Sequence, residues 1–136
     1  MESLATGYFT VEEDADGHWL QVVSGALPLE LKGTLFRNGP GRFEVAPDAP
    51  YSHPYDGDGL VCAITFTNGR AFFRSRFVQT PELQAELAAG RVLFRNAFAT
   101  QRTGPAWANA LDTYVKNTAN TNVVCWGGRV LALFEV

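Results

Sequence analysis

The stretch 53–60, HPYDGDGL, brings together residue types that bind metals or transfer protons, because it holds His53 and two aspartates. Alternating carboxylates also begin the calcium loop of an EF-hand. That loop needs an oxygen ligand at position 5, glycine at position 6 and glutamate at position 12. Counted from Asp56, these positions hold Leu60, Val61 and Thr67. The EF-hand interpretation therefore fails at all three positions.

Other reactive centres find no better support in the spacing of polar residues. The histidines His18 and His53 and the cysteines Cys62 and Cys125 match no zinc-ligand motif. No G-x-S-x-G motif presents a nucleophilic serine, and the glycine-rich stretches lack the lysine of a phosphate-binding loop. The sequence therefore predicts no complete metal or hydrolase site.

Taken by its residues alone, 53–60 is a turn that precedes a strand. Asp56 and Asp58 can cap nearby backbone N–H groups, and Gly57 and Gly59 can adopt positive φ. The apolar run 60–66 that follows predicts a strand covered on both faces.

Two hairpins and one helix are the clearest elements that the sequence predicts. Residues 60–78 form two strand-like runs around Thr67-Asn68-Gly69, and Asn-Gly is typical of a type I′ turn. The second run alternates phenylalanine with arginine, which predicts a strand with one solvent-exposed face. Residues 80–90 predict a short helix with an N-cap, a proline at its start and a terminal glycine. Residues 122–136 predict a second apolar hairpin around Gly127-Gly128.

The remaining segments predict connections. Residues 1–26 suit a surface lead-in, and Gly39-Pro40-Gly41 predicts a turn after a short strand nucleus at 34–36. Residues 46–59 predict a loop, and 91–121 a long excursion with one helical turn near 108–111. Two hairpins separated by loops favour an all-β fold of stacked antiparallel sheets.

Composition and charge exclude several classes of protein. The chain has 136 residues, 46% of them hydrophobic and 18% charged, and a net charge of −3, which does not favour nucleic-acid binding. No signal peptide or transmembrane run is visible. With both cysteines in apolar runs, we expect a cytoplasmic protein with reduced, buried thiols.

In chain order, the motifs resemble a known family. The stretches LPLELKGTLFRNGPGRFE, HPYDGDGL, FTNGRAFFRSRFVQT and NTANTNVVCWGGRVLALFE are similar to the N-terminal part of the carotenoid cleavage oxygenases, the family of the apocarotenoid oxygenases and the retinal pigment epithelium isomerase. The resemblance runs from about Leu27 to Val136. Residues 27–136 are thus expected to be a partial propeller domain after the 1–26 lead-in.

The resemblance implies a seven-bladed β-propeller, of which this chain would form one to two blades. It also implies an Fe(II) ion, held by four histidines, at which O2 cleaves a double bond of a carotenoid or apocarotenoid into two carbonyl products. In the family those histidines lie downstream of Val136, so we expect no iron ligand, no tight iron binding and no catalytic residue in this chain alone. The full-length enzyme would contact membranes peripherally, with the apolar segment 91–99 as one contributor.

Three positions match functional residues of the family. Glu135 matches a glutamate that hydrogen-bonds a ligand histidine, and Thr121 matches a residue whose methyl group crowds an open position on the iron. Tyr55 matches an aromatic residue of the substrate passage, where the family usually has phenylalanine. As alternatives, Glu135 is a water-facing glutamate at a sheet edge, Thr121 an ordinary strand residue, and Tyr55 a residue that packs a turn. Arg37, Asn38 and Gly39 are interpreted as turn and packing residues.

The final apolar strand reaches Val136 without a cap, so we expect the core of this sheet to continue beyond it. Two other kinds of protein remain open. One is a non-catalytic β-rich fragment that pairs with another chain, including the remainder of a propeller; the other is an independent β-sandwich that binds a ligand. The substrate, the cleaved bond and the choice between oxygenase and isomerase chemistry also remain open.

Overall fold

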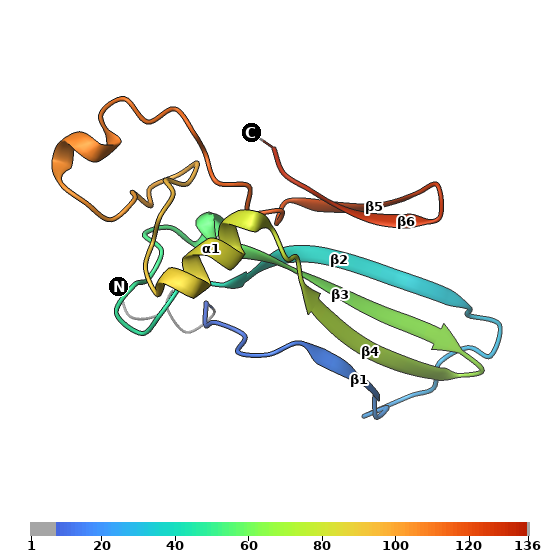
Figure 1. The fold of residues 1–136 in the computed structure, drawn as a ribbon. Helices are drawn as coiled ribbons and strands as arrows, with labels where there is room; N and C mark the ends of the chain where they lie inside the picture. The colour runs from blue at the N-terminus through green and yellow to red at the C-terminus, as the bar shows by residue number, and fades with distance from the viewer. Residues whose placement is uncertain (1–7, 136) are drawn as a thin grey trace.

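The computed structural model describes residues 8–135 (Figure 1). Its elements follow in chain order: β1 (Ala15–Trp19), β2 (Gly33–Arg42), the 3-10 turn η2 (Pro54–Asp56), β3 (Asp58–Thr67), β4 (Arg70–Phe77), α1 (Pro81–Ala89), the 3-10 turn η3 (Ala106–Asn109), β5 (Asn122–Trp126) and β6 (Arg129–Leu133). The first four strands form one antiparallel sheet in the order β1-β4-β3-β2, and β5 and β6 form a second. The prediction of antiparallel sheets built around two hairpins is confirmed.

The central hairpin has the predicted geometry. Asn68 and Gly69 have φ of 48° and 69°, and Thr67 pairs directly with Arg70. These are the positive φ values of a two-residue type I′ turn, whose twist matches that of the strands. In β4 the arginines are exposed while Ser75 and Phe77 are buried, which confirms the prediction that one face of this strand is solvent-exposed.

Helix α1 begins and ends where its capping residues predict. The hydroxyl of Thr80 accepts a hydrogen bond from the Leu83 N–H at 3.2 Å, and Pro81 occupies the first turn. Gly90 ends the helix with a left-handed φ of 62°. The turn predicted near 108–111 is present as η3, slightly earlier in the chain.

The predicted turn at Gly39-Pro40-Gly41 is wrong, because β2 continues through it to Arg42. Since β2 is the edge strand, Pro40 needs no N–H partner on its outer side, and it pairs with Gly59. A bulge after Pro40 absorbs the irregularity. A Cβ atom on Gly41 would lie 2.5 Å from the Leu60 Cβ, so this glycine provides space and not a turn.

The 1–26 lead-in also contains structure that its mixed sequence does not predict. Residues 1–7 lie outside the described residues, but β1 pairs with β4 at the sheet edge. The Trp19 ring packs edge-on against Phe72, and the guanidinium of Arg70 lies 3.8 Å from the centre of the Trp19 ring. Cross-strand contacts of this kind stabilise a strand that local sequence does not favour.

The β5–β6 hairpin lies beside β2 and turns at Gly127 and Gly128, as predicted (Figure 1). Its apolar side chains are largely exposed in the described part of the chain, and Trp126 is 78% exposed. The prediction of buried thiols is wrong for the same reason: Cys125 is exposed and Cys62 only half-buried. The 60–66 run is likewise half-buried and not covered on both faces.

Most fully buried side chains lie among the loops, the helix and the first residue of β3, residues 43–58 and 78–120, which we call the loop end of the molecule. Most of these side chains are polar. Lys116, Glu86, Asn96, Asp56 and Asp58 are each at most 1% exposed. Beside them, Val45, Tyr51 and Val92 form a small apolar cluster. No helix in residues 8–135 is long and apolar enough to cross a membrane.

Candidate functional site

The three residues predicted to serve the site line one pocket. Tyr55, Thr121 and Glu135 lie on the wall of a cavity of about 300 Å³, which we call the Thr121 pocket. The other lining residues are Asn38, Gly39, Pro40, Phe98 and Asn120. The fold therefore brings Tyr55 and Glu135 together, although they are 80 positions apart in the sequence.

Thr121 and Glu135 come from the two ends of the β5–β6 hairpin. The Thr121 N–H donates a hydrogen bond to the Leu133 carbonyl at 3.1 Å, and Asn122 pairs with Leu133. Glu135 follows two residues after Leu133. The hairpin register thus brings the two residues close together at the open end of the hairpin, where both line the pocket and both are exposed to solvent.

Tyr55, together with Phe98 and His53, forms an aromatic wall beside the pocket. It lies in η2, where His53 Nδ1 accepts a hydrogen bond from the Tyr55 N–H at 3.1 Å. The Phe98 ring meets the Tyr55 ring edge-on at 5.4 Å and stacks on His53 at 4.9 Å. Edge-on aromatic pairs are mutually stabilising, so the wall has a defined shape.

The prediction that the two aspartates of 53–60 cap nearby N–H groups is wrong. Both carboxylates instead bind segments that are more distant in the sequence. The Asp56 carboxylate accepts hydrogen bonds from the backbone N–H groups of Phe98, Ala99 and Thr100, at 2.8–3.0 Å. Asn96 also donates to the Asp56 carbonyl at 3.0 Å. Asp56 therefore fixes the loop that carries the Phe98 side of the pocket.

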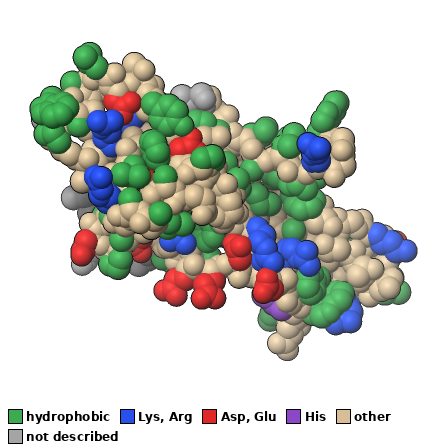
Figure 2. All heavy atoms as spheres, in the orientation of Figure 1, with side chains coloured by type: hydrophobic (Ala, Val, Ile, Leu, Met, Phe, Trp, Pro, Cys, Tyr) green, Lys and Arg blue, Asp and Glu red, His purple; other side chains and the backbone are tan. Residues whose placement is uncertain are grey.

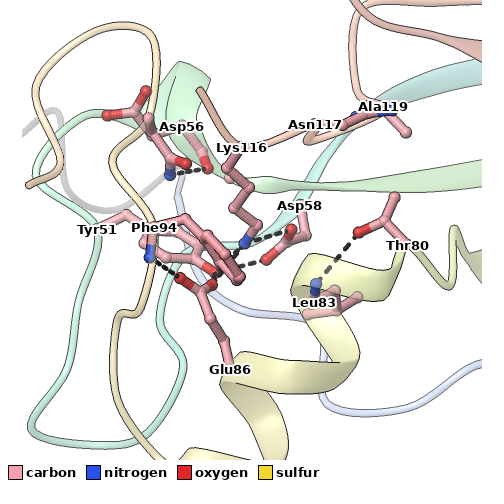
Figure 3. Close-up of polar contacts among 12 residues, drawn as sticks. Tyr51, Asp56, Asp58, Thr80, Leu83, Glu86, Phe94, Lys116, Asn117 and Ala119 are labelled. Carbon is pink, nitrogen blue, oxygen red and sulfur yellow. Dashed lines mark hydrogen bonds and ion pairs between the residues drawn. The ribbon is translucent and has the colours of Figure 1, made fainter. Parts of the chain in front are cut away.

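Asp58 belongs to a buried group of four residues, which we call the Lys116 cluster: Tyr51, Asp58, Glu86 and Lys116 (Figure 3). The Lys116 Nζ lies 2.7 Å from Asp58 Oδ1, from Glu86 Oε2 and from the Tyr51 hydroxyl oxygen. The Tyr51 hydroxyl in turn lies 2.6 Å from Asp58 Oδ2 and donates to it. The ammonium group thereby donates hydrogen bonds to Glu86 and Tyr51 and forms an ion pair with Asp58.

The Lys116 cluster joins three parts of the chain and carries perturbed groups. Burial raises the pKa of Asp58, although the neighbouring Lys116 partly opposes this shift. Burial and the two carboxylates raise the pKa of Tyr51 well above its usual range, so its hydroxyl stays protonated. Glu86 Oε1 also accepts hydrogen bonds from the N–H groups of Leu93 and Phe94. The cluster is closed to solvent, which favours a structural role.

The glycines of 53–60 serve close packing. Gly57 has φ of −66°, and Gly59 is not in the left-handed region, so the prediction of positive φ is wrong for both. A Cβ atom on Gly59 would lie 2.2 Å from the Ala119 carbonyl oxygen. The strand can therefore approach the segment before Thr121 only because residue 59 has no side chain.

The described residues do not supply a metal-ligand set. In residues 8–135, no three His, Cys, Asp or Glu side chains gather closely enough to hold a metal ion. His18 lies against Phe73 on the sheet, and His53 packs in the aromatic wall. The expectation that ligand histidines lie downstream of Val136 stays a prediction.

Sequence reasoning missed the polar residues that hold the pocket together. Lys116 follows an irregular segment, which gave no sign that its charge is buried. The sequence around Asn38 predicts a turn or packing residue, and Asn120 stands in the polar run NTANTN, which is also typical of an exposed loop. Only the tertiary fold shows that the two asparagines bond to distant backbone and that Lys116 bonds to distant side chains.

Comparison with known proteins identifies the class to which this fold and pocket belong. The family model described as retinal pigment epithelial membrane protein matches residues 8–136, so the chain belongs to this family of carotenoid oxygenases. The resemblance drawn from the motifs is thereby confirmed.

Among individual relatives, the apocarotenoid-15,15'-oxygenase of Synechocystis sp. is 43% identical over 130 residues, which cover 95% of this chain and 26% of that protein. The resveratrol cleavage oxygenase 1 of Chaetomium globosum is 36% identical over 115 residues, covering 83% of this chain and 18% of that protein. The chain thus spans about a quarter or less of the length of these relatives.

Solved structures agree with the sequence relatives. A cobalt-substituted form of the Synechocystis enzyme matches with a TM-score of 0.85 and 43% identity, over 95% of this chain and 27% of that one. A second structure of that enzyme gives a TM-score of 0.86. The prediction of an all-β, N-terminal portion of a seven-bladed propeller is confirmed.

Proposed function

We propose that this chain forms one wall of the active site of an oxygenase that cleaves a conjugated double bond of an apocarotenoid or carotenoid. One O2 and one C=C bond would give two carbonyl products, so that both oxygen atoms are accounted for. The iron that family members use would activate the O2, and four histidines outside residues 8–135 would hold it. The observation that carries this proposal is the convergence of Tyr55, Thr121 and Glu135 on one pocket.

The roles of Thr121 and Glu135 find support in the relatives. Solved variants of the Synechocystis enzyme replace a threonine and a glutamate that lie fourteen positions apart in that protein, and Thr121 and Glu135 have the same separation. We assign Glu135 to accept a hydrogen bond from a ligand imidazole N–H, which would orient the ring and raise its basicity. Thr121 would place its methyl group beside an open position on the metal.

Tyr55 suits a wall of an apolar substrate passage. It lines the Thr121 pocket and also a larger cavity of about 660 Å³, which Tyr8, Phe9 and Phe43 border. An aromatic residue shared by two cavities could contact an elongated polyene on its way to the site. Its π face would also stabilise positive charge that develops along the polyene.

Membrane contact is a further part of the proposal, because a carotenoid substrate partitions into lipid. Val92 of the 91–99 segment is core, whereas Phe98, Trp107 and Leu111 are exposed. Figure 2 shows hydrophobic side chains gathered over the loop that carries η3. We expect Leu111→Ser to weaken liposome co-sedimentation, and Val23→Ser, at an equally exposed residue elsewhere, to leave it unchanged. Equal loss in both variants would overturn this part.

The activity is tested with a hybrid in which this chain replaces the matching quarter of the Synechocystis enzyme. The iron-loaded hybrid should convert an apocarotenal into two carbonyl products under O2, as detected by chromatography and mass spectrometry. Resveratrol, tested in parallel, distinguishes a stilbene-cleaving specificity. A folded hybrid that retains iron and cleaves neither compound would refute the proposal.

The non-catalytic alternative predicts a different result. A β-rich chain that acts only by pairing with another protein needs no pocket residue for its role. Replacement of Thr121 or Glu135 would then leave its function and its association unchanged. Measurable cleavage by the hybrid, lost on replacement of Glu135, is incompatible with that alternative.

A further inference from the structure

The segment Asn117–Thr121, which carries Thr121 into the pocket, has an unfavourable backbone that needs outside support. Ala119 has φ of 48°, in the left-handed region, and is 3% exposed. An alanine rarely adopts this conformation unless its surroundings impose it. The Asn117 Oδ1 accepts a hydrogen bond from the Ala119 N–H at 2.9 Å, but this bond lies within the segment and cannot anchor it.

Asn38 holds this segment from the side of β2. Its Nδ2 donates to the Ala119 carbonyl at 2.7 Å and to the Asn122 carbonyl at 2.9 Å. These two carbonyls flank Thr121 in the sequence. A single amide group therefore fixes the backbone on both sides of Thr121 to a strand of the other sheet.

Asn120 holds the same segment from the side of Tyr55. Its Nδ2 donates to the Tyr55 carbonyl at 2.9 Å and to the Gly57 carbonyl at 2.6 Å, and the residue is 9% exposed. Its Oδ1 accepts a hydrogen bond from the Thr121 hydroxyl at 3.3 Å. The side chain thus links the aromatic wall directly to Thr121, and it limits rotation of the threonine hydroxyl.

Both asparagines act through two N–H donors aimed at backbone carbonyls, which an aspartate cannot supply. We propose that Asn38 and Asn120 are positioning residues, which set the place and side-chain rotation of Thr121 relative to Tyr55 in the Thr121 pocket. The consequence for cleavage rests on the proposed function, whereas the geometric claim concerns this chain alone.

The geometric claim is tested by amide hydrogen exchange of the 136-residue chain, measured by NMR. Asn38→Asp and Asn120→Asp keep the side-chain shape and remove the donors. Each should speed exchange at the Thr121 N–H at least tenfold and leave the β3 amides beyond Gly59 unchanged. The Gly59 N–H is left out of this reference set because it donates to the Thr118 carbonyl of the same segment. Asn120→Ser, which removes the amide without adding charge, replaces Asn120→Asp if that variant does not fold.

Asn109 provides a matched control. Its Oδ1 accepts from the Arg102 N–H and its Nδ2 donates to the Arg102 carbonyl, each at 3.1 Å, but it does not line the pocket. Asn109→Asp should leave Thr121 exchange unaltered. Unchanged exchange in the Asn38 and Asn120 variants, an equal effect of Asn109→Asp, or an equal loss of protection throughout the sheet would each overturn the inference.

A second readout connects the geometry to the reaction. In the hybrid enzyme, Asn120→Asp should lower kcat at least tenfold with a smaller change in KM, because the pocket is misaligned while most substrate contacts remain. Asn109→Asp should keep both constants. If the unsubstituted hybrid is inactive, the proposed function fails, and the exchange result still decides the role of the asparagines.

Discussion

The loop end of the molecule and the β5–β6 hairpin are stabilised in opposite ways. At the loop end, Lys116 and Glu86 are completely buried and bonded to several partners. On the hairpin, Trp126 and Leu131 are exposed, and β5 and β6 pair with each other through an antiparallel backbone ladder. Figure 2 shows hydrophobic side chains on the surface toward the hairpin end as well.

This difference matters because the Thr121 pocket lies where the two regions meet. Tyr55 belongs to the loop end, whereas Thr121 and Glu135 belong to the hairpin. The loop end supplies a fixed wall, and the hairpin must be held against it. The two regions should therefore respond very differently to substitution.

The largest effect is expected at Lys116. Lys116→Met removes the positive charge from between Asp58 and Glu86 and leaves two carboxylates buried without it. Loss of one partner from a buried charge pair costs about 3–5 kcal/mol of unfolding free energy. Lys32→Met, at an exposed lysine, should change it by less than about 0.5 kcal/mol. Urea denaturation measures both, and similar values for the two variants would contradict the comparison.

The second-largest loss of unfolding free energy is expected at Asp56. Asp56→Asn keeps the shape but weakens a carboxylate that accepts three backbone N–H groups, and hydrogen bonds to charged groups contribute about 1.5–3 kcal/mol. We expect a loss of about 2 kcal/mol of unfolding free energy. The exposed Asp48→Asn serves as control. An Asp56 variant as stable as the control would show that the 98–100 loop is not held by this carboxylate.

The Lys116 cluster also predicts a pH dependence. Burial raises the pKa of Asp58 above its ordinary value of 3.8. The folded chain thus holds this proton more tightly than the unfolded chain. The resulting stabilisation is complete below pH 3.8 and is lost as the pH rises through the folded pKa.

Asp58→Asn removes this ionisation. The unfolding free energy of the wild type minus that of Asp58→Asn should therefore fall as the pH rises from below 3.8 toward neutrality. Denaturation of both proteins across this range measures the difference. A difference that is constant or increases with pH would show that Asp58 is not destabilised by its burial.

The smallest effect is expected on the hairpin. Leu131→Ala removes an exposed side chain and should cost less than about 1 kcal/mol. Leu83→Ala, at a leucine that is 1% exposed, should cost about 2–5 kcal/mol. If Leu131→Ala costs as much as Leu83→Ala, the hairpin face is more strongly packed than its exposure indicates.

Sequence reasoning predicted the elements whose signals are local. Asn68-Gly69 fixes a hairpin through φ alone, and Thr80 with Gly90 delimits a helix through caps within a few residues. The local sequence does not predict that β2 continues through Pro40. A proline fits within a strand only where that strand lies at a sheet edge, and sheet order is a property of the tertiary fold.

The pocket was predicted only in part. The family motifs pointed to Tyr55, Thr121 and Glu135, and the fold brings these three together. The supporting side chains, Asn38 and Asn120, bond to backbone more than 60 positions away. No spacing rule within a segment encodes such contacts, so they emerge only from the tertiary structure.

Glu135 provides the most direct test of the central claim, that the Thr121 pocket is part of the surroundings of a catalytic metal. Glu135→Gln and the control Glu30→Gln, at an exposed glutamate far along the chain, are compared in the iron-loaded hybrid. We measure iron affinity and the rate of apocarotenal cleavage. Glu135→Gln should lower one or both by about 10–100-fold, with Glu30→Gln unchanged. Equal iron affinity and equal rates in the two variants would contradict the account.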